Sequence, residues 1–511
     1  MDDSARHRYI LDVTRVHLLA GLLALFVPLL GASPSQAADP LWTGSRAAEA
    51  RGQALLTVLR AAADHGLNPA WYGLTDIDRA LASEADRTRA EQLLGDAFVA
   101  YASDVSTGRV RANMIDKDID IQQRKAEPAD LLRAAADAVD FPAYLASLPP
   151  RGDYPALQKA LAGWRQKRAA TAFTPMPAVD ALLKPGMTDA RVPILRQRLA
   201  ELDMTVPPPA SAADLYDEAL AAVVKAYQET KGLTVDGVIG AKTTQSLNTT
   251  IDDRITQLVA NLERRRWLPE DLGSRHVLVN AGDYSMVFVD NGQRVFESLV
   301  IVGTPKDPTP EIQSVMRGFQ TNPHWTVPQS ISGEEYLPLL RRDPNALAAG
   351  GFKIFASWSD NDSELDPTTV DWSAIHPKAF PYRIRQEPGA SNALGYIFFP
   401  FANKYGIYMH DTANRWLFTE GSRNFSHGCI RLQNPLDFVE KVFNGRNGFD
   451  KARVQQVINA AQQAHYTFPE PVTLYVTYRT VSTTADGVAT FRDDVYGRDR
   501  RVVQAMDKPR T

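Results

Sequence analysis

The chain of 511 residues contains a single cysteine, Cys429, in the stretch NFSHGCIRLQNP. His427 lies two residues before it, and His410 lies upstream in the stretch YGIYMHDT. A thiolate is the nucleophilic form of cysteine, and a neighbouring base or cation helps it to form near neutral pH. These residues predict a cysteine acyltransferase or hydrolase. The alternatives are an inert buried thiol and a zinc site made of the same three side chains.

The residues next to the cysteine supply further groups that catalysis needs. If the stretch is a strand, His427, Cys429 and Arg431 point to one face, because alternate residues share a face. Gly428 lets a substrate carbonyl approach the backbone, and the N–H groups of Gly428 and Cys429 could stabilise an oxyanion. His410 ends the preceding expected strand and can lie beside them. Arg431 suits a substrate carboxylate, with a structural salt bridge as the alternative.

Other polar and aromatic residues are assigned supporting roles. We expect Ser426 to hold the loop before the cysteine by a hydrogen bond. Asp411 or a backbone carbonyl is expected to orient the His410 ring. Three nearby aromatic residues are expected to pack rather than to contact a substrate: Trp325, Tyr396 and Trp416.

Composition excludes one broad class of function. The net charge is −4 and the sequence pI is about 6.2, without the basic excess of a nucleic-acid-binding protein. Hydrophobic residues make up 44% and charged residues 23%, which is typical of globular domains, and the length favours several of them. We therefore expect a multidomain globular protein with no nucleic-acid partner.

Residues 1–37 have the pattern of a secretory signal. A basic start precedes a short apolar run over 16–32, and Ser35 and Ala37 provide the small residues of a cleavage site. We expect cleavage near Ala37 or Ala38, with an uncleaved membrane anchor as the alternative. Exported chains commonly pair their cysteines as disulfides, which a single cysteine cannot do within one chain, so Cys429 is expected to be reactive or intermolecular.

Two helical regions are expected before the catalytic stretch. Over residues 39–175, apolar residues with helical spacing, such as Leu94, Phe98 and Tyr101, predict a helical domain without evident chemistry. Residues 179–248 predict three small helices around a glycine-containing turn, which as a structure alone would be a spacer.

Residues 275–481 predict a mainly β domain, because apolar and polar residues alternate and Asn291-Gly292 is typical of a tight hairpin. Residues 328–395 interrupt this pattern. An insertion of this length is usually functional, and we expect it to act as a lid. The last residues, 482–511, are charged and weakly patterned, so we expect a partly mobile tail. The predicted fold class is multidomain α + β.

Two stretches resemble known families. His410 followed by SHGCIR resembles the signature of the L,D-transpeptidase catalytic domain, also called the YkuD-like fold. The stretch AVVKAYQETKGLTVDGVIGAKTTQSLN resembles the peptidoglycan-binding module, with Tyr227 where that family usually has phenylalanine. NPHWTVPQSI and PGASNALG are similar to segments of the larger Gram-negative type, which also carries a helical scaffold domain and a lid-like insertion.

The resemblance implies roles for the site residues. Cys429 would attack a carbonyl of a peptidoglycan stem peptide and form a thioester. His410 would be the general base and acid, and His427, although it is the competing base because it is nearer in sequence, would shape the pocket or bind substrate. No metal or organic cofactor is implied.

The resemblance also implies the reaction and its location. A tetrapeptide stem would donate the acyl group, and the side-chain amine of a diamino acid in another stem would accept it, giving a 3–3 crosslink. Inhibition by carbapenems and a periplasmic location are expected, with membrane contact only through a retained signal. The same site would serve an L,D-carboxypeptidase or the attachment of a lipoprotein to peptidoglycan. A non-catalytic wall-binding protein acting through residues 179–248 is the alternative from another class.

Overall fold

The computed structural model describes residues 39–170, 173–178, 181–231, 233–359 and 363–509. The predicted signal, residues 1–37, lies outside the described residues and remains a prediction. Within the described ranges, every helix is too short or too polar to cross a membrane.

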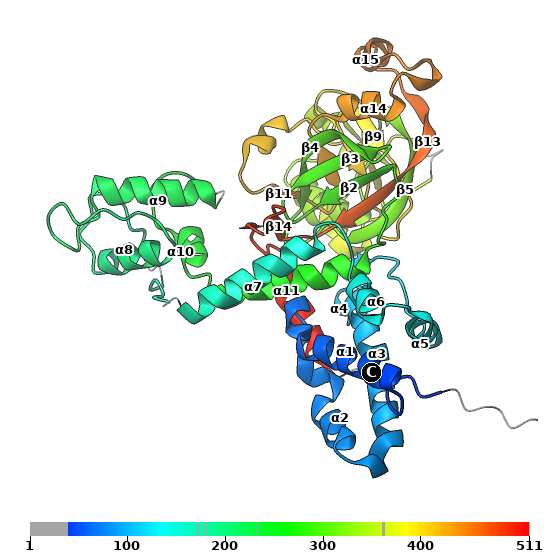
Figure 1. Cartoon of the computed structure of the whole chain (residues 1–511). Coiled ribbons are helices and arrows are strands. Elements are labelled where there is room, and N and C mark those ends of the chain that lie inside the picture. Colours follow the sequence, from blue (N-terminus) through cyan, green and yellow to red (C-terminus); the bar gives the residue numbers. More distant parts are fainter. Residues whose placement is uncertain (1–38, 171–172, 179–180, 232, 360–362, 510–511) are drawn as a thin grey trace, which may run out of the picture. The chain divides into compact units, whose positions relative to one another are not determined.

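The N-terminal region is helical, as predicted (Figure 1). Leu94, Phe98 and Tyr101 lie buried on one face of α3 (Arg87–Thr107), where they pack against α1 (Arg46–Arg60). Helical spacing places these apolar side chains on one stripe, and burial of that stripe stabilises the bundle. The region also contains α2 (Leu74–Leu81), α4 (Ala112–Ile115), α5 (Pro128–Asp137), α6 (Phe141–Ser147) and α7 (Tyr154–Ala170).

The next region is the expected three-helix module, which has its own apolar core. Its helices are α8 (Arg191–Glu201), α9 (Glu218–Thr230) and α10 (Ala241–Leu247). Tyr227 is buried in this core, and its hydroxyl lies 2.8 Å from Ser246 Oγ. A buried tyrosine needs a partner for its hydroxyl, so Ser246 explains how tyrosine replaces phenylalanine here.

The β domain follows the long helix α11 (Ile251–Trp267), which the sequence patterns did not predict. In the predicted hairpin between β3 and β4, Asn291 and Gly292 have φ values of 51° and 74°. These left-handed angles match the tight turn that favours this dipeptide. The strands are β2 (His276–Asn280), β3 (Ser285–Asp290), β4 (Gln293–Gly303), β5 (Glu311–Thr321), β9 (Ile397–Phe399), β10 (Met409–His410), β11 (Asn424–Ser426), β12 (Ile430–Leu432) and β13 (Ala464–Thr477).

The main sheet closes on itself. Its strand order is β1 (Ile119–Asp120), β5, β13, β2, β3, β4, β12, β10 and β9, and β9 also pairs with β5. This last pairing closes the strands from β5 to β9 into a barrel, which leaves few unpaired strand edges. Its apolar interior continues onto α14 (Pro435–Phe443) and α15 (Lys451–Asn459).

One strand of the sheet comes from the N-terminal region. β1 (Ile119–Asp120) pairs in parallel with the start of β5, and Lys117 O accepts a hydrogen bond from the Tyr405 hydroxyl at 2.7 Å. Residues within the predicted helical domain therefore complete the edge of the β domain.

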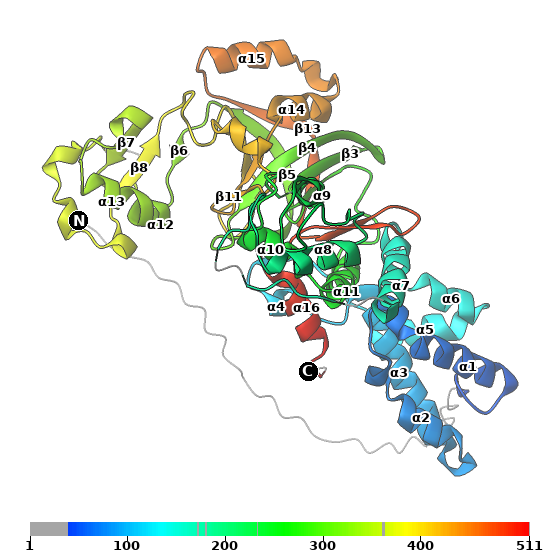
Figure 2. The same cartoon turned by 90° about the vertical axis from the view of Figure 1, so that its left-hand side faces the viewer.

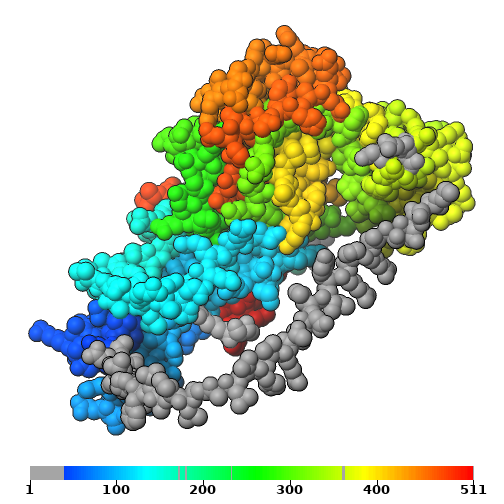
Figure 3. All heavy atoms as spheres, turned by 90° about the vertical axis from the view of Figure 1, so that its right-hand side faces the viewer, coloured from blue at the N-terminus to red at the C-terminus, as the bar shows by residue number. Residues whose placement is uncertain are grey.

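The insertion predicted over 328–395 is a small folded unit. It has a sheet of β6 (Trp325–Thr326), β8 (Arg383–Gln386) and β7 (Phe352–Phe355), with α12 (Gln329–Ile331) and α13 (Leu337–Leu340) beside it (Figure 2). Val327, Leu337 and Ile384 belong to its separate apolar core. It forms one continuous yellow-green mass in Figure 3. A core of its own makes the insertion an ordered element and not an extended loop.

The prediction of a partly mobile C-terminal tail is wrong for the described residues. Residues 481–491 form a hairpin of β14 (Val481–Thr483) and β15 (Ala489–Phe491), and α16 (Arg498–Met506) follows. Val502 and Met506 of α16 are buried in the apolar core of the N-terminal helices. The charges that suggested exposure are instead paired: Arg498 with Glu311 and Asp116, and Asp499 with Arg264.

Candidate active site

The candidate site lies where β10 and β12 run side by side in parallel. Met409 pairs with Ile430, and His410 pairs with Arg431. Met409 and Ile430 are buried in the barrel core, so the side chains on either side of them point to the opposite face. This register places His410 and Arg431 on one face, together with Cys429, which immediately precedes β12.

The segment that carries Cys429 is a loop and not a continuous strand. β11 ends at Ser426 and β12 begins at Ile430. Gly428 between them has a φ of 103°, which favours glycine and breaks the alternation of side chains. The expectation that His427 and Cys429 share a face of one strand is therefore wrong.

His427 instead contacts the insertion. Its Nε2 lies 2.6 Å from Oε1 of Glu335, which belongs to the helical turn Ser332–Tyr336. The His427 side chain remains 42% exposed. The geometry thus gives His427 a contact that joins the catalytic loop to the insertion.

Ser426 holds the loop in its conformation. Its hydroxyl donates to the Cys429 carbonyl at 2.5 Å and accepts from the Gly428 N–H at 3.2 Å. The Gly428 N–H is therefore engaged and not directed at an oxyanion. The Cys429 N–H has no acceptor among the described residues, and it is the remaining backbone candidate for that role.

The thiol of Cys429 is half-buried, and burial raises its pKa to about 11. The backbone and the hydroxyl of Tyr408, followed by the charge of Arg431, oppose this shift by stabilising the thiolate. At neutral pH the group is therefore a thiol with donors already in place for the anion.

His410 is buried, and burial together with the neighbouring charge of Arg431 lowers its pKa to about 3. The backbone of Asp411 and Leu394 partly opposes the shift. Its Nδ1 has no hydrogen-bond partner among the described residues. A neutral imidazole can accept a proton, so His410 has the protonation state that a general base requires.

Asp411 does not orient the imidazole through its carboxylate. One carboxylate oxygen accepts from the Tyr396 N–H at 3.0 Å, and the other lies 2.6 Å from Arg415. Burial raises the pKa of Asp411, while these two donors oppose the rise. The expectation that the Asp411 carboxylate orients His410 therefore finds no support in these contacts.

The guanidinium of Arg431 makes no hydrogen bond or ion pair within the described part of the chain, and its Nε is buried without a partner. The alternative of a structural salt bridge therefore finds no support. Burial lowers the pKa of Arg431, and the nearby Cys429 opposes this shift. A guanidinium without an anion beside the thiol can bind a substrate carboxylate.

Sequence reasoning missed two contacts of the site. The hydroxyl of Tyr408 faces the thiol, and the Trp325 Nε1 donates to this hydroxyl at 3.2 Å. The position of Tyr408 two residues before His410 was a signal for the first contact, because alternate residues share a face. Trp325 was expected only to pack, and Trp416, also expected to pack, is 64% exposed.

Two cavities among the described residues do not have Cys429 in their lining. One of about 160 Å³ is lined by Asp411, Tyr396 and Arg415, and another of about 680 Å³ is lined by residues of α14 and α15. No cluster of three or more potential metal ligands occurs among the described residues.

Three regions of the chain match known domain families. Residues 274–454 match the family model described as L,D-transpeptidase catalytic domain. Residues 35–161 match a scaffold domain, and residues 188–247 match a domain described as "Putative peptidoglycan binding domain".

A curated relative from Haemophilus influenzae, named "Putative L,D-transpeptidase", is 32% identical over 258 residues. The match covers 50% of this chain and 50% of that protein, so the chain spans about half the length of the relative.

Two solved structures are also similar. An L,D-transpeptidase from Xylanimonas cellulosilytica is 15% identical, with a TM-score of 0.16, over 59% of this chain and 99% of that one. A mutant L,D-transpeptidase from Enterococcus faecium is 12% identical, with a TM-score of 0.17, over 70% of this chain and 93% of that one.

The cysteine loop thus lies within the part of the chain that matches the L,D-transpeptidase catalytic domain. The two helical regions before it match a scaffold domain and a peptidoglycan-binding domain.

Proposed function

We propose that this chain is a peptidoglycan L,D-transpeptidase that forms 3–3 crosslinks through a thioester on Cys429. One observation carries the proposal: the register of β10 and β12 places His410 and an unpaired Arg431 on the face occupied by the only thiol. The peptidoglycan-binding domain in the same chain supports a cell-wall substrate. A periplasmic location, reached through the signal predicted over residues 1–37, is part of the proposal.

The residues present can carry out acyl transfer in two steps. Cys429 Sγ attacks the carbonyl at the L-centre of the third-position diamino acid, and His410 takes the thiol proton. The tetrahedral intermediate then expels the terminal D-alanine amine, which receives that proton. Proton transfers of this kind typically contribute about 10²–10⁴-fold. In the second step His410 accepts a proton from the incoming amine as this amine attacks the thioester. The second intermediate then expels the Cys429 thiolate, which takes that proton back from His410.

The supporting residues have separate roles in this proposal. Arg431 binds the terminal carboxylate of the donor stem, and the Cys429 N–H stabilises the oxyanion. The Tyr408 hydroxyl hydrogen-bonds the thiolate as it forms. The insertion acts as a lid that limits the access of water to the thioester, which favours an amine as acceptor. Without that exclusion the same site would release a tripeptide, as an L,D-carboxypeptidase does.

Purified protein incubated with tetrapeptide muropeptides, with the products resolved by mass, tests the proposal. We expect crosslinked dimers and released D-alanine, and Cys429→Ala should abolish every product because it removes the nucleophile. Dimer formation by Cys429→Ala would overturn the mechanism. Tripeptides alone would indicate a carboxypeptidase, and unchanged muropeptides would indicate a wall-binding protein. Inhibition by a carbapenem is expected through acylation of the same thiol.

A further inference from the structure

A short loop that joins β4 to β5 forms a hydrogen bond with the backbone of Gly428. The hydroxyl of Thr309 accepts from the Gly303 N–H at 2.8 Å and donates to the Gly428 carbonyl at 2.9 Å. Thr309 is fully buried, so water cannot replace either bond. Thr309 thus fixes the direction of the Gly428 carbonyl.

The direction of that carbonyl also determines the direction of the Cys429 N–H. The two groups belong to one planar trans peptide unit, in which C=O and N–H point in opposite directions. The N–H of Gly428 donates to the Ser426 hydroxyl, so the Cys429 N–H is the free donor next to the thiol. Rotation of the Gly428 carbonyl away from Thr309 would turn this donor away from a bound substrate.

A residue near the C-terminus fixes the loop that carries Thr309. The hydroxyl of Tyr496 donates to the Gly303 carbonyl at 2.8 Å and accepts from the Thr309 N–H at 3.3 Å. Tyr496 is 8% exposed. One phenol therefore bonds both ends of the loop between residues 303 and 309.

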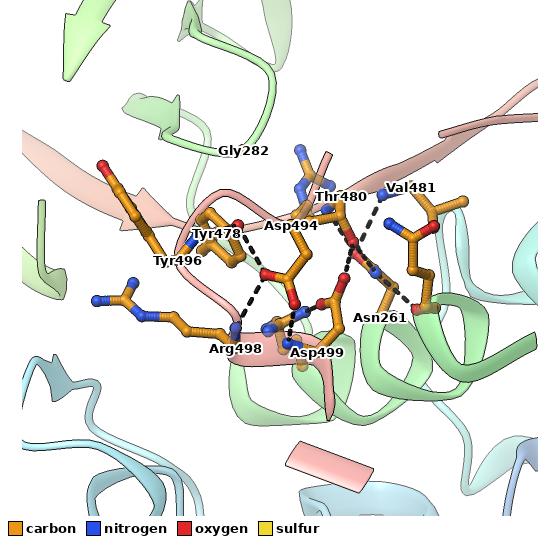
Figure 4. Close-up of polar contacts among 12 residues, drawn as sticks. Asn261, Gly282, Tyr478, Thr480, Val481, Asp494, Tyr496, Arg498 and Asp499 are labelled. Atoms are coloured by element: carbon orange, nitrogen blue, oxygen red, sulfur yellow. Dashed lines mark hydrogen bonds and ion pairs between the residues drawn. The ribbon is translucent and has the colours of Figure 1, made fainter. Parts of the chain in front are cut away.

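Tyr496 is itself held by a buried network (Figure 4). Its N–H donates to the Tyr478 hydroxyl at 3.1 Å, and this hydroxyl donates to Asp494 at 2.8 Å. Asp494 also accepts from the backbone N–H groups of Arg498 and Asp499, at 2.9 and 2.8 Å. Buried hydrogen-bond networks of this kind rigidify the structure around them.

The guanidinium of Arg498 adds a second link to the same loop. It donates to the Thr309 carbonyl and to Glu311, each at 3.4 Å, and it is fully buried. Tyr496 and Arg498 lie beyond residue 454, where the match to the catalytic-domain family ends. The catalytic loop is therefore supported by a part of the chain outside the matched catalytic domain.

We propose that Thr309 and Tyr496 are positioning residues that orient the Cys429 N–H toward the oxyanion of the acyl-transfer reaction. The inference rests on the proposed function. Neither residue touches the substrate. The C-terminal segment acts through Tyr496 on the loop at 303–309, and this loop acts through Thr309 on the peptide unit between Gly428 and Cys429.

The test compares two reactions of the same thiol in full-length variants. Acylation by a carbapenem develops an oxyanion, whereas alkylation by iodoacetamide does not. Thr309→Val and Tyr496→Phe should slow single-turnover acylation about tenfold to a hundredfold, because a misdirected donor loses much of its effect. The alkylation rate should change less than about twofold. Thr309→Ser keeps the hydroxyl and should restore the acylation rate.

Thr480→Val is the matched control for stability. It removes a buried hydroxyl that bonds Asn261 and Asp499 in the same segment without touching the loop at 303–309. We expect a lower Tm and an unchanged acylation rate. Equal acylation by Thr309→Val and the wild type would overturn the inference, as would parallel losses of acylation and alkylation. Failure of the wild-type protein to react with the carbapenem would count against the proposed function instead.

Discussion

The two reacting groups are both neutral at rest. Burial raises the pKa of Cys429 to about 11, and burial with the Arg431 charge lowers the pKa of His410 to about 3. A preformed thiolate–imidazolium pair would need the opposite shifts. In the proposed mechanism, proton transfer therefore accompanies the attack of Cys429 on the carbonyl, and we expect slow reaction of the thiol with reagents that need a thiolate in advance.

The pH dependence of alkylation tests this state. Above about pH 4 the imidazole of His410 is already neutral, so it adds no titration near neutral pH. The thiolate fraction rises with pH up to the pKa of Cys429, about 11. The rate with iodoacetamide, measured by mass between pH 6 and 10, should rise about tenfold per pH unit. A plateau beginning near pH 6 or 7 would instead show a preformed ion pair.

Part of the site could be predicted because it depends on local spacing. The hydroxyl of Ser426 and the free guanidinium of Arg431 are near Cys429 in sequence, and both occur where the pattern suggested. The contact of His427 could not be predicted, since it depends on the positive φ of Gly428 and on Glu335 in the distant insertion. Sequence periodicity contains neither a local break in backbone conformation nor a partner so far along the chain.

At the level of elements, the insertion meets the catalytic domain through a small set of polar contacts. His427 contacts Glu335, Lys306 lies 2.8 Å from Glu334, and Trp325 bonds Tyr408. Because the insertion has its own core, it can move as a unit while its interior stays intact. Exposed polar pairs are individually weak, which is compatible with the opening and closing that we propose for the insertion.

Glu335→Ala should loosen this contact and admit water. We expect the ratio of tripeptide to crosslinked dimer to rise by up to about fivefold, since an exposed polar pair contributes up to about 1 kcal/mol. The ratio is measured by mass analysis of the muropeptide products. Glu364→Ala is the matched control, because its pair with Lys353 lies within the insertion. A ratio equal to that of the wild type in Glu335→Ala would contradict a lid held by this contact.

At the level of the whole molecule, the N-terminal region is joined to the barrel through the sheet and to the C-terminal residues through a common apolar core. The N-terminal region supplies β1 to the barrel, and α16 supplies Val502 and Met506 to the N-terminal core. The alternation of residues and the hairpin dipeptide allowed the β domain to be predicted. The folded structure of the C-terminal residues could not be predicted. Their charges are neutralised by Arg264 and Glu311, which precede them by nearly two hundred residues or more.

Met506→Ala should destabilise the N-terminal helices although it lies near the other end of the chain. Truncation of a buried methionine typically costs about 2–5 kcal/mol through lost burial and the remaining cavity. Thermal unfolding followed by circular dichroism should show a lower Tm. Arg500→Ala is the control, since this side chain is 75% exposed and its pair with Asp253 is long at 3.5 Å. Equal Tm values for Met506→Ala and the wild type would show that α16 is not needed for that core.

The position of α16 has a consequence for the order of folding during synthesis. Trp42 and Leu55, which emerge early from the ribosome, share a core with Val502 and Met506, which emerge late. Contacts between residues so far apart in sequence form slowly, because a long loop must close first. The core of the N-terminal helices is therefore complete only when Val502 and Met506 have joined it.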